Sequence, residues 1–287
     1  MDRDAWSIVF YHEQECWLVT QQLKSLIHFN NTLEYNLVIN EDRRGIKRTV
    51  ALLKKYGFYD LAKKSKFPIN IYTREDLIGL HHYLGCGYID QQLIKLRVYK
   101  KSKYKESIIL DGKLIAVKEN PLDDIQPARH SLPYSFYGWW EYCLRKWHKS
   151  SFKTKDFKQP RLVRVPYIFK NDILKALEND FEDEAAYFDF LKQDRFPKYS
   201  YFRSILKNSS WEHPGYLSEF MIYNLFEQYY DENYVEEYPN PTSLCFVKKG
   251  DEVPLENEPF ISLHRQLVKE LGFDRAEALV KKYTGME

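Results

Sequence analysis

Several short motifs that identify common enzyme classes are absent from this sequence. It has neither a GxGxxG fingerprint nor a GxxxxGK(S/T) loop, the glycine-rich segments that hold the phosphates of dinucleotides and of ATP. It also lacks a GxSxG elbow and an HExxH segment, which mark serine hydrolases and zinc proteases. These absences argue against a dehydrogenase, a P-loop ATPase and both classes of hydrolase.

Cysteine is scarce and scattered. The chain has four cysteines and no CxxC pair, which argues against a zinc knuckle, a thioredoxin-like site and a disulfide framework. We expect buried free thiols instead. The four residues are Cys16, Cys86, Cys143 and Cys245.

Long apolar segments are missing as well. The chain starts with Met1, Asp2, Arg3 and Asp4, without the basic stretch and apolar core of a signal peptide. No run approaches the roughly 18 apolar residues that a membrane-spanning helix needs. We therefore expect a cytoplasmic protein with no membrane span.

The total charge is small. A formal net charge of +2 over 287 residues does not require nucleic acid or an anionic membrane as a partner. Residues 145–161 are locally basic, with five lysines and two arginines against one aspartate. This stretch is either a solvated loop or helix face, or a site for an anionic acceptor.

The apolar pattern of the first 111 residues alternates between strand and helix periods. Short β-rich runs predict strands at 6–11, 37–40, 69–72 and 107–111, and three- and four-residue recurrence predicts helices at 13–29, 46–56 and 89–99. This order indicates βαβ units in a doubly wound α/β sheet. Later patterns predict strands at 162–169, 244–247 and 260–263, and helices at 172–178 and 274–283. We see no linker that would divide residues 1–287 into independent domains.

Polar residues follow each of the four early strands. Ligands of doubly wound sheets bind beyond the carboxyl ends of the strands, where loops from neighbouring units converge. The residues selected by this rule are Tyr11, His12 and Glu13, then Asn40, Glu41 and Asp42, then Thr73 and Arg74, and finally Asp111, Gly112 and Lys113.

Two groups of polar residues are candidates for chemistry. Asp111 directly follows an apolar strand, a common place for a carboxylate that faces a metal ion or a phosphate, although such a residue is as often a turn or cap residue. Gln91, Gln92 and Lys95 lie early in a predicted helix, where amides and an ammonium can hold a sugar or a diphosphate. The alternative is an ordinary amphipathic helix with leucine and isoleucine inside.

The order of these motifs resembles a known family. The DUF6492 group of GT-A-like glycosyltransferases has a "GW..QQ..KL" segment, then a strand ending in an Asp-x-Asp motif, and later an "SE-aromatic-x-x-Tyr" segment. Matching segments occur here in the same order over roughly residues 5–230, at 87–96, 108–113, 162–166 and 216–223. The resemblance implies one GT-A-like (Rossmann-like) domain over residues 1–287, with a mixed, mostly parallel central sheet flanked by helices. Residues 1–118 would form the half that binds the nucleotide sugar, and residues 119–287 the acceptor side.

Site residues carry over position by position. Asp111 matches the first carboxylate of the Asp-x-Asp motif, which in GT-A enzymes helps to hold a divalent ion, Mn²⁺ or Mg²⁺, against the diphosphate of the donor. Glu219 matches the acid of the later motif, and the amides and lysine of residues 91–95 match the first motif. The second carboxylate is replaced by Lys113. Either this ammonium replaces the cation as the counter-charge of the leaving diphosphate, or the chain binds a nucleotide sugar without turning it over.

The resemblance thus implies transfer of a sugar from a UDP- or GDP-type nucleotide sugar to a glycan or another hydroxyl acceptor. Glu219 is the candidate base, and His264 a candidate metal ligand with Asp111, although a lone histidine is more often not a ligand. Base and ribose would be received by Tyr11, His12, Asn40 and Asp42.

Two other functions stay open. Loss of the second carboxylate favours a catalytically silent GT-A-like module that binds a glycan or a protein. The basic stretch 145–161 would suit a transferase that acts on modified nucleic acid, with its lysines along the phosphates.

Overall fold

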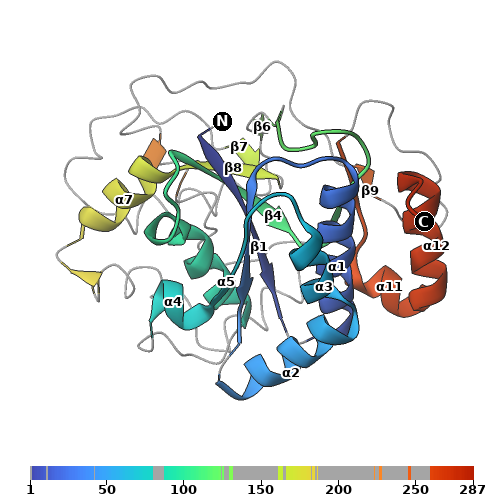
Figure 1. Cartoon of the computed structure of the whole chain (residues 1–287). Helices are drawn as coiled ribbons and strands as arrows, with labels where there is room; N and C mark the ends of the chain where they lie inside the picture. Colours follow the sequence, from blue (N-terminus) through green and yellow to red (C-terminus); the bar gives the residue numbers. More distant parts are fainter. Residues whose placement is uncertain are drawn as a thin grey trace, which may run out of the picture.

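The computed structural model describes residues 2–10, 12–41, 43–79, 87–123, 125, 129–131, 161–163, 166–181, 183, 184, 186, 223, 226, 227, 245, 246 and 259–287. Its centre is a five-stranded sheet in the order β3-β2-β1-β4-β8. The four strands β1 (Arg3–Val9), β2 (Glu34–Ile39), β3 (Ile69–Thr73) and β4 (Glu106–Asp111) are parallel, and β8 (Tyr167–Lys170) pairs antiparallel with β4. The predicted α/β class with a mostly parallel sheet is confirmed (Figure 1).

Helices cover both faces of this sheet. On one face lie α1 (Glu13–His28), α2 (Arg43–Lys55) and α3 (Phe58–Lys64), and on the other lie α4 (Arg74–Ile78), α5 (Gly87–Leu96), the 3₁₀ turn η2 (Val98–Lys100) and α7 (Asn171–Asn179). The alternation of side chains along a strand explains the two layers. In β1, Ala5 and Val9 pack with the α1 layer, whereas Trp6 and Ile8 pack with the α5 layer.

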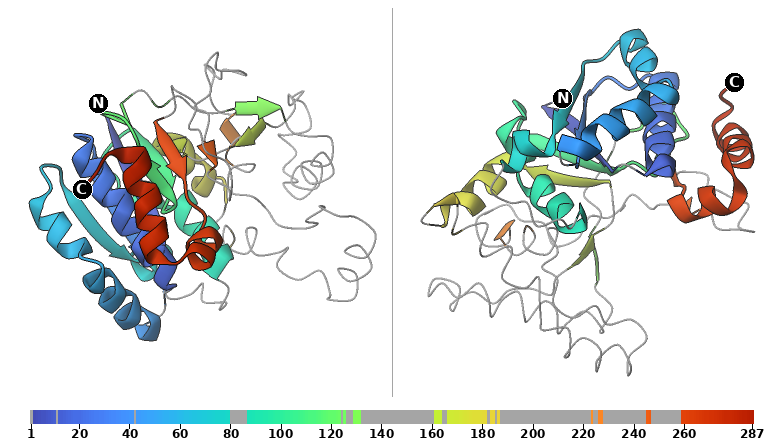
Figure 2. Two further views of the ribbon diagram at one scale, coloured as in Figure 1. Left: turned by 90° about the vertical axis from the view of Figure 1, so that its right-hand side faces the viewer. Right: turned by 90° about the horizontal axis from the view of Figure 1, so that it is seen from below.

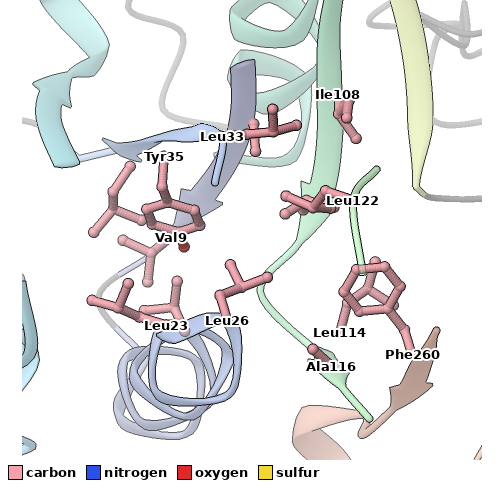
Figure 3. Packing of buried hydrophobic residues seen from close by; sticks show 14 of the residues in the cluster. Val9, Leu23, Leu26, Leu33, Tyr35, Ile108, Leu114, Ala116, Leu122 and Phe260 are labelled. Carbon is pink, nitrogen blue, oxygen red and sulfur yellow. The ribbon is translucent and has the colours of Figure 1, made fainter. Parts of the chain in front are cut away.

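The core under α1 shows why these segments fold as they do. Leu23 and Leu26, three residues apart on α1, are completely buried against Tyr35 of β2 and Val9 of β1 (Figure 3). Three-residue spacing places both leucines on one face of the helix. Burial of each such side chain stabilises the fold by about 2 kcal/mol.

A second, smaller sheet joins the end of the chain to its beginning. Its order is β5-β10-β9, with β5 (Leu114–Ala116), β10 (Phe260–Ser262) and β9 (Cys245–Phe246). Two helices follow, α11 (Arg265–Leu271) and α12 (Phe273–Thr284), and they pack in one apolar cluster with Trp17 and Leu18 of α1. Figure 2 shows this C-terminal part, in red, beside α1. A separate pair of strands, β6 (Arg129–Ser131) and β7 (Arg161–Val163), is antiparallel.

The strands begin earlier than their apolar runs. β1 starts at Arg3 and β2 at Glu34, each three residues before the predicted start, because buried polar side chains bond to one another there. Asp4 accepts hydrogen bonds from Ser107 (2.8 Å) and Asn36 (3.2 Å), and the Asn36 side-chain oxygen accepts one from Asn70 (2.9 Å). Polar residues satisfied in this way occupy strand positions that hydrophobic patterning does not detect.

One predicted strand was wrong. The strand predicted at 162–169 is two strands in different sheets, β7 and β8, with Pro166 between them. Proline cannot donate a backbone hydrogen bond and therefore interrupts strand pairing. The helix predicted at about 46–56 is confirmed as α2, although it begins earlier, at Arg43. A short helix that was not predicted, α3, follows it after Gly57, which has a left-handed conformation (φ 82°) that glycine adopts readily. None of the helices within the described residues combines the length and the apolar character needed to cross a membrane.

Candidate functional site

The carboxyl ends of the four parallel strands lie level with one another. Ile8 is opposite Asp111, Val9 is opposite Ile39, and Ile39 is opposite Thr73. The next residue of the β2 segment, Asn40, donates its backbone N–H to the carbonyl of Val9 (2.9 Å). This edge therefore brings together the segments that follow all four strands, as the position rule for open α/β sheets requires.

The tight connection from β4 to β5 is the centre of the candidate site. It consists of Asp111, Gly112 and Lys113, and the Lys113 Nζ lies 2.9 Å from Asp111 Oδ2. Both side chains are mostly buried, with 22% of the Asp111 side chain and 29% of the Lys113 side chain exposed. The two residues that the sequence places at an Asp-x-Asp position thus form an ion pair.

Positive charge controls the ionisation of Asp111. Burial alone would raise the pKa of its carboxyl, but the charges of Lys95 and Lys113 and the hydrogen bond from Lys113 outweigh burial and hold the pKa below its ordinary value. Lys95 acts from α5, because Asp111 continues the face of β4 on which Ile109 packs with that helix layer. Asp111 is therefore ionised at neutral pH beside two ammonium groups.

The C-terminal part of the chain brings His264 to the same connection. The backbone N–H of Leu263 donates to the Lys113 carbonyl (2.9 Å), and the next residue, His264, is the N-cap of α11. Its Nδ1 accepts a hydrogen bond from the Gln266 N–H (3.2 Å). Burial, together with the charges of Lys113 and Arg265, lowers the pKa of His264. The ring is then neutral with its proton on Nε2, which makes that nitrogen a donor in this conformation.

Gln22 holds the connection between β4 and β5 in place through hydrogen bonds, and this residue was not predicted from the sequence. This α1 residue is completely buried. Its side-chain amide donates to the carbonyls of Asp111 (2.8 Å) and Leu114 (3.0 Å), while its oxygen accepts from Ser7 (2.6 Å) and Tyr35 (2.9 Å). A polar residue among the apolar positions of an amphipathic helix was the available signal, since a buried amide needs partners.

The helix α5 carries the predicted Gln91, Gln92 and Lys95. Gln92 and Lys95 are buried, and Gln91 is partly buried. The helix is tied to the end of β3 by a buried ion pair, in which Arg74 Nη1 donates to Asp90 Oδ2 (2.9 Å). The position rule selected Arg74, but its partner Asp90 could not be found from sequence spacing.

The remaining predicted residues divide into two groups. His12 is the N-cap of α1, where its carbonyl accepts from the N–H groups of Glu15 and Cys16, and Asn40 is buried beside the end of β1. Three predicted residues, Tyr11, Asp42 and Glu219, lie outside the described residues, as does most of the basic stretch 145–161.

Within the segment 216–223 only Tyr223 is described. Its hydroxyl accepts a hydrogen bond from the N–H of Lys170 (2.8 Å), and Lys170 pairs with Glu106 at the far end of β4 from Asp111.

Divalent ions prefer several oxygen ligands, chiefly carboxylates. No group of three or more His, Cys, Asp or Glu side chains that could hold a metal occurs in the described part of the chain. Asp111 is already paired with Lys113, and His264 presents a donor. The described side chains do not fit a divalent ion, and coordination by Asp111 and His264 stays a prediction.

Comparison with solved structures gives a distant similarity. The chain is similar to a galactosyltransferase. That protein is LgtC, in a crystal structure with donor and acceptor sugar analogs; identity is 11%, the TM-score is 0.35, and the match covers 77% of this chain and 69% of that chain. No protein-family model and no curated protein matches. A similarity this distant assigns no activity to the present chain.

Proposed function

We propose that this protein is a glycosyltransferase that moves a sugar from a UDP- or GDP-type nucleotide sugar to a glycan or another hydroxyl acceptor. The observation that carries the proposal is the Lys113–Asp111 ion pair, with the charge of Lys95 beside it, at the ligand-binding edge of a mostly parallel sheet. The order of the DUF6492-like motifs along the chain supports the same function. The predicted cytoplasmic location stays a prediction.

The charge at this edge suits a leaving diphosphate. Two ammonium groups, those of Lys95 and Lys113, act on one carboxylate, so the group carries a net positive charge. An ammonium is a point-charge ligand for phosphate oxygens, and fixed positive charge lowers the energy of a transition state in which negative charge develops. In this proposal the lysines do the work that a divalent ion does in related folds.

The reaction breaks the bond between sugar C1 and the diphosphate oxygen, and its electron pair stays on the diphosphate. A bond forms between C1 and the acceptor oxygen, whose proton passes to a base. For an inverting reaction, Glu219 is the proposed base. His264 can donate its Nε2–H to the diphosphate, and Tyr11, His12, Asn40 and Asp42 remain the proposed contacts to base and ribose.

A thermal-shift panel with UDP-, GDP- and CMP-sugars, each with Mn²⁺ or with EDTA, tests the donor site. We expect one nucleotide class to stabilise the protein equally under both conditions, by about 2.7 kcal/mol at 100 times its Kd. Stabilisation that needs Mn²⁺ would contradict the role of Lys113. No stabilisation by any donor would remove the nucleotide-sugar site.

A silent binding module is the second candidate, and Lys113 in place of a carboxylate is the observation that favours it. The two functions differ in turnover. Donor binding with release of nucleoside diphosphate in the presence of hydroxyl acceptors supports the transferase. Binding of a glycan without any such release supports the silent module.

A further inference from the structure

One continuous segment of the chain is strongly basic. Residues 43–66, which form α2 and α3 and the residues after them, contain nine lysines and arginines and one aspartate, a net charge of +8. The whole chain has a net charge of +2, so all other residues together have a net charge of −6. A small total charge therefore hides a strong separation of charge.

The basic side chains of α2 share its outer face. Lys47, Arg48, Lys54 and Lys55 are exposed, whereas Leu53 is completely buried in the cluster with α1. Positions 47, 48, 51, 54 and 55 recur at three- and four-residue steps and so form one stripe. Position 51 is alanine, and the other four positions are lysine or arginine. The stripe runs from residue 47 to residue 55, about 12 Å along the helix axis.

The next helix, α3, packs beside α2 and is also basic. Lys63, Lys64 and Lys66 are exposed there, and α2, α3 and α1 contact one another in one layer. Five of the lysines form no salt bridge with any acid among the described residues: Lys47, Lys54, Lys63, Lys64 and Lys66. We call the exposed basic side chains of residues 47–66 the basic face.

This distribution differs from that of an ordinary solvated helix. Solvated helices usually carry both signs, because Glu–Lys pairs four residues apart stabilise them and like charges destabilise them. α2 begins with two arginines and has no acid in its first turn, although the positive end of the helix dipole disfavours cations. A folded helix with this repulsion between like charges and this unfavourable dipole interaction is suited to bind an anionic partner.

We propose that the basic face binds the surface of a membrane that contains anionic lipids. The exposed side chains of residues 47–66 are lysine, arginine, one alanine and one aspartate, Asp60, without exposed aromatic or amide groups of the kind that stack on or read nucleic acid bases. Ile71 of β3, 38% exposed, is the most exposed large hydrophobic residue in the described part of the chain. It continues the face on which Ile69 packs with the α3 layer. Basic groups with an apolar neighbour are the combination that adsorbs to a lipid surface.

The location of the basic face gives the binding a consequence. α2 starts shortly after Asn40, so its first turn lies near the carboxyl edge of the sheet. In Figure 1, α2 lies at the bottom of the molecule, and β1 points toward that side. Adsorption through this face would hold the Asp111 edge close to the lipid headgroups. Membrane binding through the basic face does not require the proposed transferase activity.

Sedimentation of the full chain with vesicles tests the proposal. Vesicles of phosphatidylcholine are compared with vesicles that contain phosphatidylglycerol, at low and high salt. We expect binding only to the anionic vesicles, and loss of that binding as salt shortens the Debye length from about 10 Å at 0.1 M to about 3 Å at 1 M. The variant Lys47→Gln/Lys54→Gln/Lys63→Gln should bind about 100-fold more weakly, since each lysine near an anionic surface contributes about fivefold.

A matched variant controls for net charge. Lys101→Gln/Lys118→Gln/Lys269→Gln removes the same charge at exposed positions outside the basic face and should keep most of the binding. All six positions are exposed, so both variants should retain the thermal unfolding midpoint of the parent chain. Absence of binding to anionic vesicles, equal loss in both variants, or binding to duplex DNA but not to vesicles would overturn the proposal.

Discussion

The ammonium of Lys113 lies 2.9 Å from the carboxylate of Asp111, at the position where a second carboxylate would complete an Asp-x-Asp motif. Lys113 therefore adds a positive charge to the motif and does not only remove a carboxylate ligand. A divalent ion and an ammonium both neutralise a carboxylate, but only the ammonium is covalently part of the chain, so it stays in place without free metal.

Replacement of Lys113 tests this relationship. Lys113→Ala should reduce turnover of the preferred nucleotide sugar about 100-fold, the usual cost of one electrostatic contact to developing charge, and should raise the pKa of Asp111, which loses a neighbouring cation. Lys113→Asp should make turnover depend on Mn²⁺. Initial rates with EDTA or Mn²⁺ provide the measurement, with Lys118→Ala as an exposed control. A Lys113→Ala enzyme with unchanged rates would refute the assigned role.

Gln22 should matter for both stability and the site. Gln22→Leu leaves two carbonyls and two hydroxyls without their partner, and each buried polar group left in this way costs about 1–3 kcal/mol. We expect urea unfolding to show a loss of at least about 3 kcal/mol, and donor binding to weaken more than the smaller folded fraction accounts for. Ser25→Ala, which removes a buried α1 hydroxyl that accepts from the Ala116 N–H, should lose stability without weakening donor binding. Equal effects on binding in both variants would show that Gln22 is only structural.

Asp4 should make stability depend on pH near neutrality. Burial, with repulsion from Glu34, raises the pKa of its carboxyl from 3.8 to about 6, although the hydrogen bond from Ser107 (2.8 Å) opposes the shift. A raised pKa in the folded state means that folding favours the protonated carboxyl. The contribution of Asp4 to the free energy of unfolding is therefore fully present below the unfolded pKa and is lost as pH rises through about 6. The limit is about 3 kcal/mol.

The variant Asp4→Asn isolates this contribution. The Ser107 hydroxyl has one proton and two acceptors within reach, Asp4 (2.8 Å) and Asn171 (3.1 Å). An asparagine at position 4 can donate to Ser107, which then donates to Asn171. Between pH 5 and pH 7.5, the unfolding free energy of the parent chain should fall relative to that of Asp4→Asn. A difference that does not change with pH would mean that Asp4 titrates near its ordinary value.

The buried pair of Arg74 and Asp90 should be costly to break. Asp90→Leu leaves a guanidinium without its carboxylate in a site where 8% of the Arg74 side chain is exposed, and such changes cost about 3–5 kcal/mol. The double variant Arg74→Met/Asp90→Leu should recover most of this loss, because it leaves no buried charge. Lys55→Ala breaks the exposed pair with Glu13 (2.6 Å) and should cost less than about 1 kcal/mol. Chemical unfolding of all three variants distinguishes the cases.

The site was only partly predictable from sequence. Asp111 and Lys113 were found because they directly follow an apolar strand, and in a parallel sheet that position lies at the ligand-binding edge. Gln22 and Asp90 were missed, since their partners lie 89 and 16 residues away along the chain and no local pattern relates such positions. His264 was selected as a metal ligand, but its hydrogen bond to Gln266 makes Nε2 a donor.

The sequence by itself determined the α/β class, the order of the four parallel strands along the chain, and the placement of Asp111 at the end of the fourth. These properties follow from the periods of apolar residues, which depend on neighbours within about ten positions. Only the tertiary structure decided that Lys113 and Lys95 act on one carboxylate, that polar residues begin β1 and β2, and that the basic helices α2 and α3 pack side by side. Each of these depends on packing between segments distant in the chain, where burial and Coulomb energies are set by distance in space.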